Sequence, residues 1–99
     1  MFVDWTYAKA HVWQRHGLTM DQVQEASDDE GAVLLNPDPK SRSGDSARLI
    51  GFCASRREVL VVIVVRKQGG EWWGATAWVA GPRDRMIYEG RWADDQPQE

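Results

Sequence analysis

The sequence predicts an α+β fold: two N-terminal helices packed on one face of a three- to four-stranded antiparallel sheet, followed by a short C-terminal helix. Helix start and stop signals occupy the first thirty residues, and short apolar segments separated by turn residues follow them. A chain of 99 residues supports one modest core. We therefore expect a single domain over residues 1–91 and a flexible acidic tail over residues 92–99.

The first helix is expected over residues 7–16. The segment FVDW that precedes it is apolar and aromatic, which is typical of a short strand, and Thr6 can serve as the helix N-cap. Gly17 suits the left-handed backbone conformation that commonly ends a helix. These signals predict one short helix that ends in a tight corner.

The second helix has the better-marked start. Thr19 and Gln22 have the spacing of a capping box, and Leu18 and Val23 occupy the flanking positions of a hydrophobic staple. A short helix is therefore predicted over about residues 20–26, so that the two helices form a hairpin.

The rest of the chain is predicted to form an antiparallel meander. The segment VLVVIVV is apolar throughout and rich in β-branched residues, which favours a strand buried on both faces at the centre of the sheet. Gly81 and Pro82 can begin a last helix that extends to about Glu89. One face of the sheet is expected to stay partly open, and strands are expected over residues 32–36, 47–54, 59–65 and 72–80.

Charge is distributed unevenly along the chain. The net charge is −3, but residues 31–93 carry ten Lys and Arg against six Asp and Glu. Segregated charge can give one face a positive potential while the whole protein is acidic. An ordinary solvated surface and a nucleic-acid-binding face are both compatible with this pattern.

Metal and thiol chemistry are not expected. The single cysteine, Cys53, lies in an apolar segment that is typical of an inert buried thiol, and it has no partner for an internal disulfide. Together with the two histidines, His11 and His16, it does not make a closed zinc site. We expect neither a metal nor a cofactor.

His16 is the leading candidate for proton transfer. A histidine in the last turn of a helix is stabilised as a cation by the helix dipole, and histidine is suited to acid–base catalysis near neutral pH. The alternative is a histidine that only stabilises the helix end. Several arginines, each an ordinary surface charge by itself, could together supply the cations that an RNA phosphate needs: Arg15, Arg56, Arg57, Arg66, Arg83 and Arg85.

Several segments carry a resemblance to a known family. They are RHGLTMDQVQEA, LIG, VLVVIVVR and WWGATAW, followed by a final helix that ends in Tyr88. Their order and spacing resemble the BrnT-type toxins of the RelE/ParE superfamily, which belong to type II toxin–antitoxin systems, over nearly the whole chain up to about residue 90. The resemblance implies a RelE-like fold and a metal-independent endoribonuclease that cleaves messenger RNA and is held inactive by a cognate antitoxin.

The family motifs map onto individual residues of this chain. Arg15-His16-Gly17 matches a Lys-His-Gly corner, with arginine in place of lysine, and Arg66 matches an arginine after the central strand. Thr76-Ala77 matches the start of a Ser/Thr-Ala-Arg element, but Trp78 stands where that element has arginine. Tyr88 matches a tyrosine in the final helix. Because a tryptophan cannot replace a cation, weakened activity is one expectation.

Cleavage of RNA without a metal uses the ribose 2′-OH as the nucleophile on the adjacent phosphate. A base takes the hydroxyl proton, cations stabilise the phosphorane, and an acid protonates the leaving 5′-oxygen. The resemblance and this chemistry together make His16, Arg15, Arg66 and Arg85 the candidate catalytic residues. The candidate RNA-binding residues are Arg56, Arg57, Trp72, Trp78, Arg83 and Tyr88.

The tryptophans of the last strand are candidates for a base-stacking platform. In a regular strand, Trp72, Gly74, Thr76 and Trp78 share one face and Trp73 lies on the other. If the helices cover the opposite face, Trp72 and Trp78 lie on the open one, where indole rings can stack on bases. The alternative is that these rings belong to the core.

The expected partners are RNA and a cognate antitoxin, and a homo- or hetero-oligomer is compatible with both. No apolar run is long enough to span a bilayer and no leader pattern opens the sequence, so a cytoplasmic location without membrane contact is expected. A non-catalytic protein- or RNA-binding module on the same fold is the alternative function. It is motivated by Trp78 in place of arginine and by the net charge of −3.

Overall fold

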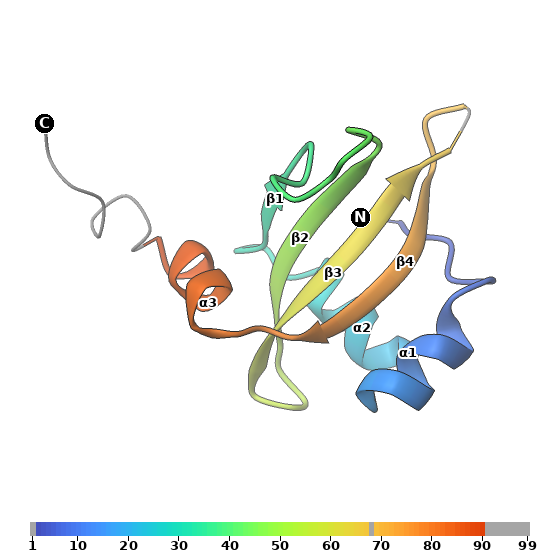
Figure 1. Cartoon of the computed structure of the whole chain (residues 1–99). Helices are drawn as coiled ribbons and strands as arrows, with labels where there is room; N and C mark the ends of the chain where they lie inside the picture. The colour runs from blue at the N-terminus through green and yellow to red at the C-terminus, as the bar shows by residue number, and fades with distance from the viewer. Residues whose placement is uncertain (1, 68, 91–99) are drawn as a thin grey trace, which may run out of the picture.

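A computed structural model describes residues 2–67 and 69–90 of the chain (Figure 1). The predicted acidic tail, residues 92–99, lies outside the described residues. The fold is α+β, as predicted, and every predicted helix and the four main strands are present with small shifts of their ends. The elements in chain order are α1 (Lys9–His16), α2 (Met20–Ser27), β1 (Val33–Leu35), β2 (Ser46–Cys53), β3 (Glu58–Arg66), β4 (Trp72–Val79) and α3 (Pro82–Tyr88).

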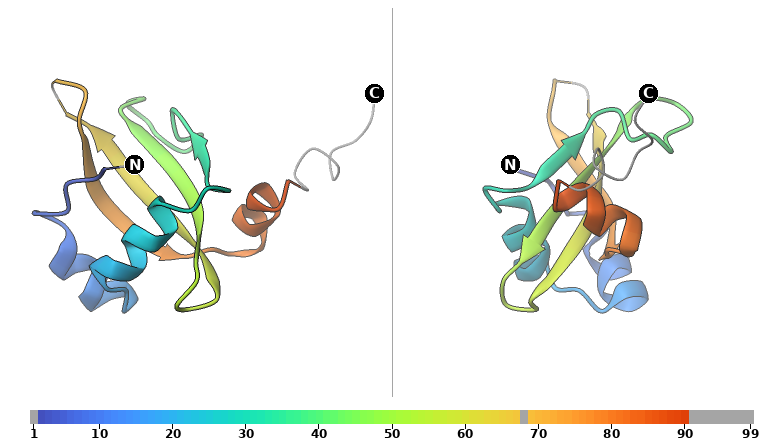
Figure 2. Two further views of the ribbon diagram at one scale, coloured as in Figure 1. Left: turned by 180° about the vertical axis from the view of Figure 1, so that it is seen from behind. Right: turned by 90° about the vertical axis from the view of Figure 1, so that its left-hand side faces the viewer.

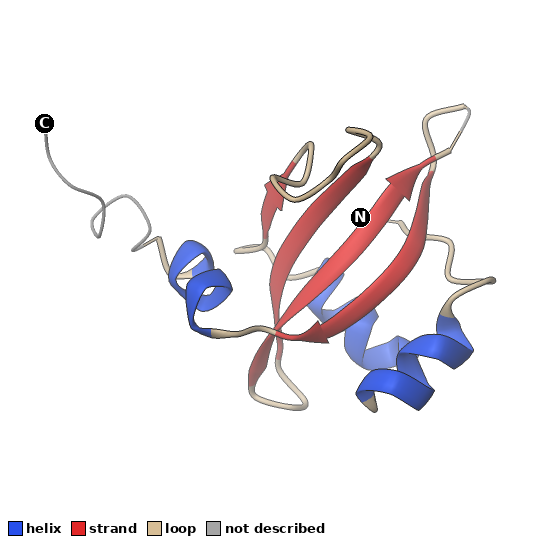
Figure 3. Ribbon diagram, viewed as in Figure 1, coloured by secondary structure: helices blue, strands red, loops and turns tan. Residues whose placement is uncertain are grey.

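The four strands form one sheet in the order β1-β2-β3-β4, and all neighbours are antiparallel (Figure 3). The prediction of a central strand buried on both faces is confirmed, because β3 lies inside the sheet and its residues 59–62 and Val64 are buried. The predicted opening strand is reduced to an isolated parallel bridge between Asp4 and Trp73 at the outer edge of β4.

Both helix ends at the corner follow the sequence signals. Gly17 ends α1 in the left-handed conformation, with φ of 67°. Thr19 and Gln22 form the predicted capping box at the start of α2. The prediction of Thr6 as the N-cap was wrong, because α1 begins at Lys9 and Ala8 is its N-cap residue. The amide and hydroxyl of Thr6 both donate to the Asp4 carboxylate.

The two N-terminal helices cover one face of the sheet, which we call the helix face. α2 lies across β2 and β3, whereas α1 lies beside the β4 edge (Figure 2). Glycines allow two close approaches here. A Cβ at Gly51 would overlap the backbone carbonyl of Ala26, and a Cβ at Gly74 would overlap the ring of Trp5. Apolar packing therefore dominates this face, with Val12, Leu18 and Val23 fully buried.

The opposite surface, which we call the open face, carries α3 over β2 and β3. Figure 2 shows α2 and α3 on opposite sides of the sheet. Ile87 and Tyr88 of α3 pack against a small cluster that includes Ile50 and Val61. The short helix leaves the part of the open face near α1 for other side chains to occupy.

A β-bulge in β4 overturns the predicted arrangement of the tryptophans. Ile63 pairs with Thr76 and Val64 pairs with Gly74, so Ala75 is an extra residue. An extra residue reverses the alternation of side chains along a strand. Trp72 and Gly74 therefore lie on the helix face, whereas Thr76 and Trp78 lie on the open face, and the prediction that all four share one face was wrong.

Within the described part of the chain, no helix combines the length and the apolar character needed to cross a bilayer.

Candidate functional site

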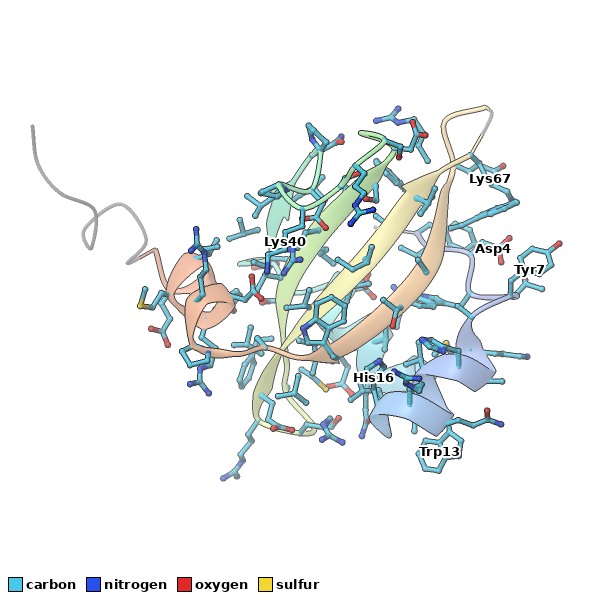
Figure 4. All side chains as sticks on the ribbon, viewed as in Figure 1. Asp4, Tyr7, Trp13, His16, Lys40 and Lys67 are labelled. Carbon is cyan, nitrogen blue, oxygen red and sulfur yellow. The ribbon has the colours of Figure 1, made fainter. Side chains whose placement is uncertain are left out.

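The helix α1 brings two histidines, His11 from its first turn and His16 from its last turn, to the rim of the open face. The ring centroids of His16 and Trp78 are 6.3 Å apart, and those of His16 and His11 are 5.8 Å apart in an edge-on contact. His11 also places its Nε2 atom 3.3 Å from the Thr76 hydroxyl oxygen. We call His11, His16, Thr76 and Trp78 the histidine cluster; Figure 4 shows His16 on α1 beside the sheet.

The local sequence explains this position of α1. Ala8 and Val12 are buried in the core of the helix face and fix one side of the helix. The side chains of His11 and His16 are then free to reach around the β4 edge. His16, in the basic last turn with Arg15, also suits the negative end of the helix dipole. The position of His16 is compatible both with proton transfer and with stabilisation of the helix end. Stabilisation of the helix end by itself does not require the contact with Trp78.

Arg48 is a buried cation on the open face, and sequence reasoning missed it. Its Nε lies 3.0 Å from Asp38 Oδ1, and its Nη1 lies 3.1 and 3.0 Å from the two carboxylate oxygens of Asp84. Its guanidinium also lies over the Trp78 ring, 5.5 Å from the centroid. An arginine inside an otherwise apolar strand was the available signal, because a buried charge needs partners.

A pocket of about 490 Å³ lies next to Arg48, between the loop after β1 and α3. Its wall mixes apolar side chains with both signs of charge. Arg83, a predicted RNA-binding residue, contributes to it from α3. The lining residues are Leu35, Asp38, Pro39, Lys40, Arg48, Arg83, Asp84 and Ile87.

Arg66 lies away from the histidine cluster. Its guanidinium stacks over the ring of Trp72, 4.7 Å from the centroid, on the helix face. Along β3, Arg66 is roughly 16 Å from Val61, the partner of Trp78, at about 3.3 Å per residue. The structure therefore does not bring Arg66 together with His16, and Trp72 is likewise separated from Trp78.

The remaining predicted arginines lie at the periphery. Arg15 is exposed beside His16, and Arg85 is exposed on α3. Arg56 and Arg57 occupy the turn between β2 and β3, where Arg56 Nε lies 2.9 Å from a Glu58 carboxylate oxygen. Of these residues, Arg15 is the one adjacent in sequence to the histidine cluster.

Tyr88 connects α3 to the loop after α2. Its hydroxyl donates to Asp29 Oδ2 at 2.6 Å, and this hydrogen bond, assisted by burial, raises the pKa of Tyr88 to about 12. Burial raises the pKa of Asp29, but hydrogen bonds from Tyr88 and from the amides of Phe52 and Gly31 outweigh it and leave that pKa lowered. Through these contacts, Tyr88 anchors α3 to the loop after α2.

A second polar group lies at the far end of β4. Lys67 Nζ is 3.4 Å from Asp4 and 3.0 Å from Glu71, and it lies over the ring of Trp73. The ring of Tyr7 also contacts Trp73. Hydrogen bonding to Glu71 is the main cause that raises the pKa of Lys67. This group attaches the N-terminal segment to the sheet (Figure 4).

The histidine cluster is the arrangement best suited to chemistry. Its imidazoles can exchange protons, its indole can stack on a base, and exposed Arg15 can meet an anion. Among residues 2–67 and 69–90, no group of three or more His, Cys, Asp or Glu side chains is placed to hold a metal ion. No protein-family model matches the sequence, and a search of curated proteins returns no match.

Proposed function

We propose that this chain is the toxin component of a type II toxin–antitoxin system, a metal-independent endoribonuclease of the BrnT type that cleaves messenger RNA in the cytoplasm. The observation that carries the proposal is the position of His16, which lies beside Trp78 at the rim of a sheet face that α3 covers only in part. A cognate antitoxin is the proposed protein partner.

The mechanism follows from the groups in the histidine cluster. An RNA strand placed over Trp78 can stack one base on the indole and present the adjacent phosphate to His16. The 2′-oxygen then attacks phosphorus, the P–O5′ bond breaks, and His16 moves a proton either from the 2′-hydroxyl or to the 5′-oxygen. Arg15 supplies a cation for the phosphorane. The products are a 2′,3′-cyclic phosphate and a 5′-hydroxyl.

Slow cleavage is part of the proposal. Arg48, whose guanidinium lies over the Trp78 ring, is held by Asp38 and Asp84, so two carboxylates offset its charge. Arg66 stacks on Trp72 on the other face. Fewer cations therefore face the proposed site than the family resemblance implies, and stabilisation of the phosphorane is correspondingly weaker.

The position of Arg66 also favours a second candidate function. A chain whose strand-end arginine is on the helix face, and whose Trp78 replaces an arginine, can serve as a non-catalytic protein- or RNA-binding module. Such a module would use the same open face and the stacking of Trp78, but it would leave RNA intact.

Expression in a bacterial host separates the two functions. Wild-type protein is expected to arrest growth, and His16→Ala is expected to restore it at equal protein levels. Gln14→Ala, an exposed position on the same helix, is the matched control and should remain toxic. The alternative outcome is that wild-type protein is harmless and that it binds single-stranded RNA in a chelator without cutting it. This outcome would overturn the toxin proposal in favour of the binding module.

A further inference from the structure

The histidine cluster contains a second imidazole for which the family motifs provide no role. His11 lies in the first turn of α1, is exposed, and contacts both His16 and Thr76. We infer that His11 is a second proton-transfer residue, so that His11 and His16 form the acid–base pair of one RNA-cleaving site. This inference rests on the proposed function.

Thr76 is suited to hold His11 through a proton-transfer cycle. A hydroxyl group can accept a hydrogen bond as well as donate one. When the Nε2–H of His11 donates to Thr76 Oγ1, Nδ1 is left as the atom that takes a proton. Protonation of Nδ1 leaves the bond at Nε2 unchanged. The ring can therefore keep one orientation in both protonation states.

The backbone around His11 is equally fixed. Its neighbour Val12 is fully buried, and Thr76 lies on β4 directly after the bulge. The bulge is what turns Thr76 toward the open face together with Trp78. If Ala75 were paired as in a regular strand, Gly74 and Thr76 would share one face, so Thr76 could lie on the open face only if Gly74 left the helix face.

The separation of the two rings fits in-line cleavage. A base and an acid must each come within about 2.6–3.2 Å of a different oxygen of the same phosphodiester. Rings with centroids 5.8 Å apart can reach the 2′-oxygen and the 5′-oxygen of one phosphate. One imidazole takes the proton from O2′ as the P–O2′ bond forms, and the other gives its proton to O5′ as the P–O5′ bond breaks. Exchange with water then restores both rings.

Two arginines of the described residues lie near the pair, one on α1 and one on β2. On β4, the side chains that contact the imidazoles are Thr76 and Trp78, which carry no charge. Arg15 precedes His16 on α1, and Arg48 of β2 lies over Trp78. Because arginine side chains in general are not deprotonated in proteins, the pH profile of the rate is a test of the two imidazoles.

The test is single-turnover cleavage of a defined single-stranded RNA in a chelator, from about pH 5 to pH 9. Wild-type protein should show a bell-shaped profile. His11→Gln and His16→Gln should each lower the rate about 10²- to 10⁴-fold and each remove a different limb of the bell. Thr76→Val should lower the rate less and keep the bell, and Gln14→Ala should match wild type. RNA binding should change by less than about threefold in the histidine variants.

Chemical rescue distinguishes proton transfer from a structural role. Added imidazole should restore part of the cleavage by His11→Ala and by His16→Ala, which loss of a purely structural contact would not allow. His11→Gln with the rate and pH profile of wild type, beside an inactive His16→Gln, would overturn the acid–base pair and leave the ribonuclease in place. Absence of cleavage by wild-type protein would instead overturn the proposed function itself.

Discussion

The two faces of the sheet are built by different physical means. On the helix face, Trp5 packs on Gly74 and α2 approaches Gly51, so stability there comes from close apolar contact. On the open face, Arg48 is buried with Asp38 and Asp84, and Trp78 lies beside His16. Buried charges cost desolvation energy. The helix face therefore maintains the fold by packing, and in the proposed function the open face retains polar groups for binding and chemistry.

The largest expected effect on stability comes from disrupting the packing of the helix face. Trp5→Ala should lower the free energy of unfolding by about 3–5 kcal/mol, because it removes a buried indole and leaves a cavity above Gly74. Trp13→Ala is the matched control, since Trp13 is 59% exposed, and it should change stability by less than about 0.5 kcal/mol. Urea unfolding measures both. Equal effects of the two substitutions would contradict this account of the face.

The next effect concerns the buried charges of the open face. Arg48→Met should cost about 3 kcal/mol of unfolding free energy, because Asp38 and Asp84 lose their shared cation. Adding Asp84→Leu to Arg48→Met should recover part of the loss, since one uncompensated carboxylate is removed. A double variant that is less stable than Arg48→Met would show that the carboxylates are stabilised by other groups.

Substitution of two tryptophans, one on each face of the sheet, tests which face binds RNA. Trp78→Ala should weaken binding of single-stranded RNA by about 1–3 kcal/mol, because a stacking ring is lost from the open face. Trp72→Ala should leave the affinity of the folded molecules unchanged, since Trp72 packs on the helix face. Titration of labelled RNA, corrected for the folded fraction, measures both. Equal losses of affinity would argue against a binding site confined to the open face.

The smallest effect concerns the anchor of α3. Tyr88→Phe should lower the free energy of unfolding by about 1 kcal/mol near neutral pH, because Asp29 loses one of its donors. The folded-state pKa of Tyr88 is raised to about 12 from 10.0, so its contribution is complete below about pH 10 and disappears between pH 10 and 12. The stability difference between wild type and Tyr88→Phe should therefore vanish across that window.

Tyr7→Phe provides the control for the alkaline measurement, since Tyr7 is largely exposed and lies outside the α3 anchor. It should show no comparable difference from wild type at neutral pH. A Tyr88→Phe difference that persists above pH 12 would indicate lost packing rather than a lost hydrogen bond.

The parts of the fold that depend on local signals could be predicted from the sequence. The capping box of Thr19 and Gln22, the left-handed Gly17 and the apolar central strand all act within a few residues, and all three are present. Thr6 failed as an N-cap because α1 begins at Lys9, with Ala8 at the N-cap position, and the Thr6 hydroxyl donates to Asp4 instead. Where the helix begins depends on how the N-terminal segment lies against β4.

The candidate site was less predictable because it depends on contacts across the fold. Gly74 in the segment WWGATAW is a weak signal for a bulge, but it does not identify Ala75 as the extra residue that places Trp72 and Trp78 on opposite faces. The contact between His11 and Thr76 joins positions that are far apart in the chain. Asp29 lies in an acidic run next to Asp28 and Glu30, and nothing local indicates that it accepts hydrogen bonds from Phe52 and Tyr88.

The most direct test of the proposed ribonuclease is the chemical nature of the RNA ends that it leaves. Purified wild-type protein and His16→Gln are incubated with single-stranded RNA in a chelator, and the fragments are analysed by mass spectrometry. We predict fragments with 2′,3′-cyclic phosphate and 5′-hydroxyl ends from wild type, and intact RNA from the variant. Intact RNA with both proteins, or the same fragments from both, would contradict the proposal that His16 on the open face cleaves RNA.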